Sequence, residues 1–154
     1  MPRSRTLHKK GPRRTPPPAR RVGKATEAET RLLALARELA ELPADATFAD
    51  VVGRLGDAHG PDAPLPRALA QAWLRGRSDK TSVLALAWAR EQVRLALEER
   101  LIRAPALGAA AADPATRAWL LLAAAESIAH EPPAAVADRL RALLEFTGQA
   151  PTPV

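Results

Sequence analysis

The side chains able to transfer protons or bind a metal are few and scattered in this sequence of 154 residues. The three histidines, His8, His59 and His130, fall in separate segments, which we read as the tail, a loop and a helix end. The chain has no cysteine, which excludes thiol nucleophiles, disulfides and cysteine-ligated metals. It also contains no Gly-x-Ser-x-Gly, His-Glu-x-x-His or phosphate-loop pattern. We therefore expect no enzyme, no metal site and no cofactor.

Glu126 and the three tryptophans are the remaining candidates for a binding site. Glu126 follows the least polar run of the chain, so its carboxylate either lines a pocket or marks the exposed edge of a helix. Trp73, Trp88 and Trp119 lie on three expected apolar helix faces, where large rings either fill the core or converge on a ligand cavity. We name these four residues as a candidate pocket for a small apolar ligand.

Basic residues are concentrated at the start of the chain. Residues 1–25 carry nine Lys or Arg and no acid, while the whole chain has a net charge of +6, so residues 26–154 are mildly acidic. The segment is rich in proline and poor in apolar residues, and we expect it to be disordered. Either its cations neutralise nucleic-acid phosphates without reading bases, or it is a solubilising extension without a partner. The candidate phosphate-binding residues are Arg3, Arg5, Lys9, Lys10, Arg13, Arg14, Arg20, Arg21 and Lys24.

The elements that must position these side chains are all expected to be helical. Alanine and leucine are abundant and aromatic residues are scarce, and both features favour helix over strand. Caps, glycines and prolines divide the chain into six helices. Their expected bounds are about 27–42, 47 to 56 or 60, 65–76, 78 or 82 to 103, 113–130 and 133–147.

Polar side chains at expected cap positions set the helix starts. Thr26 and Glu29 have the spacing of a capping box, and Thr47 opens the next helix in a similar way. Asp113 followed by Pro114 is typical of an N-cap and first helical position. The run 118–125 that follows contains no charged or hydroxyl side chain. A helix that is apolar all round must be covered all round, so this run lies either at the centre of the bundle or against a partner subunit.

Residues 80–148 resemble the C-terminal regulatory domain of TetR-family transcriptional regulators. The residues that carry the resemblance are the long helix ending Glu98-Glu99-Arg100-Leu101-Ile102-Arg103, the Ala-rich linker, the Asp113-Pro114 start and the closing Ala/Leu-rich helix. The resemblance implies that the final two helices pair with their copies in a dimeric four-helix bundle. The dimer interface would then contain Leu121, Ala124, Ala125, Ile128, Val136, Leu140, Leu143 and Leu144.

The DNA-binding half of that family is matched less well. Residues 47–56 are similar to the segment that closes the second helix of the family's helix-turn-helix. The next helix lacks the aromatic-His-Phe ending of the family's recognition helix and offers only Arg67 and Gln71 to read bases. The resemblance therefore implies either a degenerate helix-turn-helix or a regulatory domain that has lost it, and we favour the second.

We expect three parts: a disordered basic tail over 1–25, an all-α, TetR-regulator-like bundle of about six helices over 26–148, and a flexible C-terminus over 149–154. The implied function is that of a homodimeric TetR-like regulator that binds a small apolar ligand. The alternative is a non-catalytic structural protein of the nucleoid or ribosome type that binds nucleic acid through its tail. No stretch is apolar for long enough to span a membrane, and we expect a cytoplasmic protein. Ala, Gly, Arg and Pro are abundant, and all four are encoded by GC-rich codons, which indicates a bacterial source with a GC-rich genome.

Overall fold

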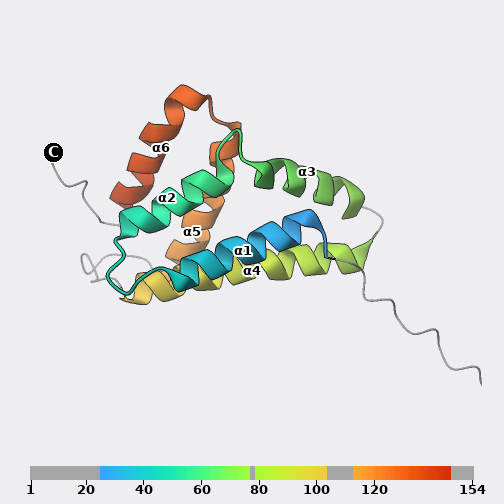
Figure 1. Ribbon diagram of the computed structural model, residues 1–154, viewed down its shortest axis with the longest axis horizontal. Helices are drawn as coiled ribbons and strands as arrows, with labels where there is room; N and C mark the ends of the chain where they lie inside the picture. Colours follow the sequence, from blue (N-terminus) through green and yellow to red (C-terminus); the bar gives the residue numbers. More distant parts are fainter. Residues whose placement is uncertain (1–24, 77–78, 104–112, 147–154) are drawn as a thin grey trace, which may run out of the picture.

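The computed structural model describes residues 25–76, 79–103 and 113–146, and the regular structure in these ranges is helical throughout (Figure 1). The all-α prediction is confirmed. Apart from Ala25, the predicted tail lies outside the described residues, as does the predicted C-terminus of residues 149–154. The described helices are α1 (Glu27–Glu41), α2 (Phe48–His59), α3 (Pro64–Gly76), α4 (Lys80–Arg103), α5 (Pro114–Ser127), a 3₁₀ turn η1 (Ile128–His130) and α6 (Pro133–Phe146).

The expected side chains cap the helix starts. At α1 the Thr26 hydroxyl accepts from the Glu29 N–H at 3.2 Å, and the Glu29 carboxylate accepts from the Thr26 N–H at 2.7 Å. Thr47 and Asp50 form the same reciprocal pair at α2, and the Asp113 carboxylate caps α5. Each cap satisfies an N–H group that the first turn of a helix leaves unpaired. The caps thereby fix the residue at which each of these helices begins.

The helices form one bundle around a shared core. α1 and α4 lie side by side, and α5 packs against α4 and contacts α2 (Figure 1). α6 covers α2, and α3 lies beside both α1 and α4. Fully buried leucines come from four of these helices: Leu32 and Leu39 from α1, Leu55 from α2, Leu97 from α4 and Leu121 from α5. Among the described helices, none has the length and hydropathy needed to cross a membrane.

The apolar run 118–125 lies at the centre of this bundle. Ala118, Leu121, Leu122 and Ala125 are all fully buried within the chain. They lie on the side of α5 that faces the core formed with α2 and α4. Of the two alternatives left open by the sequence, the structure therefore shows the central position for these four side chains.

A side chain from α4 hydrogen-bonds to the carbonyl groups at the C-terminal end of α1. The Arg100 guanidinium donates from Nε to the carbonyl oxygen of Leu39 at 2.9 Å, and from Nη1 to that of Pro43 at 3.0 Å. Its Nη2 donates to the carbonyl oxygens of Ala40, at 3.0 Å, and of Leu42. These carbonyl groups belong to the last turn of α1 and the residues after it. The last carbonyl groups of a helix have no N–H partner within the helix. One buried arginine therefore fastens α4 to the end of α1.

Candidate ligand-binding cavity

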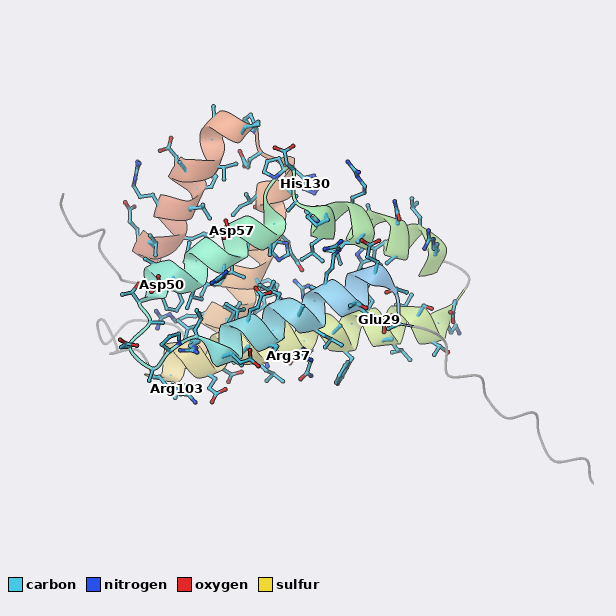
Figure 2. All side chains as sticks on the ribbon, viewed as in Figure 1. Glu29, Arg37, Asp50, Asp57, Arg103 and His130 are labelled. Atoms are coloured by element: carbon cyan, nitrogen blue, oxygen red, sulfur yellow. The ribbon has the colours of Figure 1, made fainter. Side chains whose placement is uncertain are left out.

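A cavity of about 650 Å³ lies among α2, α3, α4, α5 and η1. Its volume is within the range of roughly 300–1,000 Å³ that is typical of small-molecule sites. Most of its wall is apolar, and the polar groups are few. Figure 2 labels His130 near the place where α2 gives way to α3, and η1 contacts α2 there. The lining residues are His59, Pro66, Leu69, Ala70, Trp73, Leu86, Ala87, Arg90, Glu126, Ala129 and His130.

His59, the last residue of α2, is the buried polar side chain of this cavity. It is only 1% exposed, and neither Nδ1 nor Nε2 has a hydrogen-bond partner within the part of the chain that the structure describes. Burial lowers the pKa of His59 because a low-dielectric environment disfavours the imidazolium form; the nearby Glu126 raises the pKa and Arg90 lowers it. The ring is therefore neutral at pH 7 and presents one N–H donor and one acceptor nitrogen.

Arg90 of α4 and Glu126 of α5 form a two-pronged ion pair on the cavity wall. Arg90 Nε lies 2.6 Å from Glu126 Oε1, and Arg90 Nη2 lies 2.8 Å from Glu126 Oε2. Hydrogen bonding to Glu126 raises the pKa of Arg90, which keeps the guanidinium charged. The pair joins α4 to α5 through two residues that are 36 positions apart in the sequence. Because each charge is matched by the other, the pair gives the cavity a dipole but no net charge.

Two of the four residues predicted to form the pocket line this cavity, namely Trp73 and Glu126. Trp88 instead lines a separate groove between α1 and α4, and Trp119 is half exposed on α5. The three tryptophans therefore do not converge on one cavity. The reason is helical geometry: Trp88 follows the buried Leu86 by two residues, and residues two apart on a helix point in nearly opposite directions.

The residues predicted for the dimer interface lie against the core of the single chain. Leu121, Ala125, Ile128 and Leu143 are buried within the chain. The other four, Ala124, Val136, Leu140 and Leu144, are partly buried against the same core. The contact between α6 and α2 is close, because a Cβ atom at Gly56 would lie 2.9 Å from both terminal methyl carbons of Leu140. Four of these side chains are thus covered by their own chain and four are covered in part. The dimer interface implied by the resemblance stays a prediction.

The predicted base-reading residues Arg67 and Gln71 are both exposed on α3. They are four residues apart and therefore share one face of the helix, whereas Leu69 and Trp73 face the cavity from another side. α3 thus presents one side to the cavity and these two polar side chains on another. The nine basic residues of the predicted tail, from Arg3 to Lys24, lie outside the described residues.

Sequence reasoning missed His59 as a site residue, because it placed this histidine in a loop. α2 instead continues past Gly56 and ends at His59, with Gly60 as its C-cap. The available signal was helical spacing, since Phe48, Val52 and Leu55 form an apolar face that continues to position 59. A histidine in line with such a face is expected to point inward, toward the core or a cavity.

The burial of His59 predicts a loss of stability on mild acidification. Its pKa lies below 6.5 in the folded protein and close to 6.5 in the unfolded chain. At pH values between these two pKa values the unfolded state binds a proton that the folded state does not bind. The free energy of unfolding therefore falls as the pH decreases from about 6.5, and above that pH this group has no effect on it.

Urea unfolding of the unchanged chain and of His59→Leu, at about pH 7.5 and about pH 5.5, measures this effect. The variant should lose less unfolding free energy between the two pH values than the unchanged chain does. Equal losses in both proteins would show that protonation of His59 is not coupled to folding.

The cavity offers a neutral donor–acceptor ring, a matched ion pair and a half-exposed indole within an otherwise apolar wall. This arrangement is suited to binding a small molecule. In residues 25–76, 79–103 and 113–146, no group of three or more His, Asp or Glu side chains is placed so that it could hold a metal ion. Comparisons of the chain with protein-family models, with curated proteins and with solved structures give no match.

Proposed function

We propose that this protein is a ligand-binding regulator of the TetR-like type, in which a small molecule occupies the cavity and nucleic acid is contacted elsewhere on the chain. The observation that carries the proposal is the buried ring of His59, which has no hydrogen-bond partner among the described residues, at a cavity of about 650 Å³. A buried polar group without a partner costs about 1–3 kcal/mol. A ligand that hydrogen-bonds to His59 recovers part of this cost, so the unpaired ring favours an occupied cavity.

The exposed Arg67 and Gln71 of α3 favour the degenerate helix-turn-helix over its loss, and with it a link between the cavity and nucleic acid. Leu69 and Trp73 line the cavity, while Arg67 and Gln71 are exposed on another face of the same helix. A ligand packed against Leu69 and Trp73 restricts the position of α3, and thereby the position of the two polar side chains. The basic residues of 1–25 would add phosphate affinity that does not depend on base sequence.

Homodimerisation belongs to the same proposal, and the outward face of α4 supports it. This face exposes Leu84, Trp88, Leu95 and Ile102, and the last three are spaced by seven residues. Apolar side chains spaced by seven residues lie along one face of a helix and supply one of the two apolar positions of a coiled-coil repeat, and a second copy supplies an identical α4. We expect a dimer by mass measurement in solution and a monomer for Leu95→Glu. A strict monomer at micromolar concentration for the unchanged chain would contradict this part of the proposal.

Selection of duplex DNA from a random library by the full chain tests the regulator function. We expect the selected sequences to share a motif, and we expect Arg67→Ala/Gln71→Ala to lose that selectivity while retaining salt-dependent binding. The matched control is Glu145→Ala, an exposed polar residue of α6, the helix that packs against α2, and it should keep the selectivity. Absence of any shared motif would contradict the regulator function.

The charge of residues 1–25 favours a second candidate, a non-catalytic nucleic-acid-associated structural protein of the nucleoid or ribosome type. Nine basic residues without an acid provide affinity that falls steeply as the salt concentration rises. Replacing all nine by glutamine should abolish binding to both DNA and RNA if this function is right. Replacing Pro16, Pro17 and Pro18 by alanine keeps the charge and should leave binding intact. Sequence-selective binding that survives the nine replacements would exclude this candidate.

A further inference from the structure

We propose that the cavity selects a neutral aromatic alcohol, whose hydroxyl hydrogen-bonds to the ring of His59 and whose aromatic body packs against the apolar wall. The inference rests on the proposed ligand-binding function and names the chemical class of the ligand. Three features of the cavity support it: the composition of its wall, the state of its charges and the hydrogen-bonding capacity of the histidine.

The wall favours a flat apolar body. Leu69 and Ala70 from α3 face the cavity, as do Leu86 and Ala87 from α4. Trp73, which is half exposed, adds an indole to the lining. Aromatic rings pack well on an indole, in offset or edge-to-face arrangements. A molecule of one or two fused rings therefore suits both the shape of the lining side chains and the available volume.

The charges of the wall disfavour an ionised ligand. Two guanidinium nitrogens of Arg90 donate to Glu126, and both Glu126 oxygens accept from Arg90. A ligand carboxylate would have to compete with Glu126 for Arg90, and a ligand ammonium would have to compete with Arg90 for Glu126. Either ligand would leave one charge unmatched beside an apolar wall, which is costly. The histidine adds no charge, because burial keeps it neutral at pH 7.

The unpaired ring of His59 favours a hydroxyl among neutral polar groups. Neutral imidazole has one N–H donor and one acceptor nitrogen, and neither is paired among the described residues. A hydroxyl donates to an unprotonated nitrogen and accepts from an N–H, so it is complementary to either ring nitrogen. A ligand carbonyl or ether can only accept, and it is complementary to one tautomer alone.

Calorimetric titration of the full chain with five matched probes tests the inference. The probes are 2-naphthol, naphthalene, 2-methoxynaphthalene, 2-naphthoate and 2-naphthylmethylammonium. We expect 2-naphthol to bind at least about tenfold more tightly than each of the others, which corresponds to about 1.4 kcal/mol. Equal binding of naphthol, its methyl ether and naphthalene would overturn the role of the hydroxyl. Tightest binding of either charged probe would overturn the argument from the ion pair.

Variants identify the partner of the hydroxyl. His59→Leu should bind naphthalene as the unchanged chain does and lose the preference for naphthol. The matched control is His130→Leu, which removes the exposed histidine of the same cavity and should keep the preference. A preference that persists in His59→Leu would overturn the assignment. If His59→Leu does not fold, His59→Gln, which retains a donor and an acceptor, should keep part of the preference.

Failure of this inference can be told apart from failure of the proposed function. If the probes bind without a preference for the hydroxyl, the ligand class is wrong, although the cavity still binds small molecules. If none of the probes binds, the inference is also wrong. In both cases the DNA selection described above decides the regulator function independently, because it uses no ligand.

Discussion

Replacing Arg100 by methionine should lower the free energy of unfolding by about 3 kcal/mol, because one buried and three partly buried hydrogen bonds to carbonyl groups are then lost. Arg100 is 8% exposed and donates to four carbonyl oxygens at the end of α1, those of Leu39, Ala40, Leu42 and Pro43. The guanidinium also places a positive charge at the negative end of the α1 dipole. Methionine keeps much of the apolar stem, so the loss reports the hydrogen bonds and the charge more than packing.

Arg103→Met is the matched control for this prediction. Arg103 lies one turn further along α4, and its ion pair with Glu99 is on the surface, with more than half of each side chain exposed. Surface pairs of this kind contribute about 0–1 kcal/mol. Urea unfolding followed by circular dichroism measures both variants. If Arg100→Met costs no more than Arg103→Met, the carbonyl groups at the end of α1 do not depend on this arginine.

The helices were predictable from the sequence because their determinants are local. The capping boxes of Thr26–Glu29 and Thr47–Asp50 each lie within four consecutive residues, and the structure shows both. Apolar spacing likewise marks the inward faces of α1 and α2, where Leu32, Leu39 and Leu55 are fully buried. A cap or an apolar face depends on residues one or two turns apart, so one sequence is sufficient to recognise it.

The contacts between helices, including those at the cavity, were not predictable in the same way. Arg90 and Glu126 are 36 residues apart, and Arg100 reaches carbonyl groups 57–61 residues earlier in the chain. Periodicity shows that a helix has an inward face, but it does not show which helix covers that face. The tryptophans illustrate the difference: each was correctly placed on a helix, yet Trp73 and Trp88 line different cavities.

The position of the apolar run of α5 was also not predictable from the sequence alone. Its composition required cover on all sides without specifying whether the cover came from the same chain or another. In the structure Leu121 is fully buried within the chain, whereas Trp119, two residues earlier, is half exposed. We therefore expect Leu121→Ala to lower the free energy of unfolding by about 2–5 kcal/mol, the range for a large-to-small change in a core.

Trp119→Ala provides the control on the same helix and should change the unfolding free energy by less than about 1 kcal/mol, because half of the indole already contacts solvent. Urea unfolding at several protein concentrations separates core burial from burial at an interface. A residue covered by its own chain destabilises by the same amount at every concentration, whereas a residue covered by a second copy gives a loss that depends on concentration. Suppose instead that Leu121→Ala loses unfolding free energy only at concentrations where a dimer forms, and that the monomer is as stable as before. This result would place Leu121 at the subunit interface that the resemblance implies.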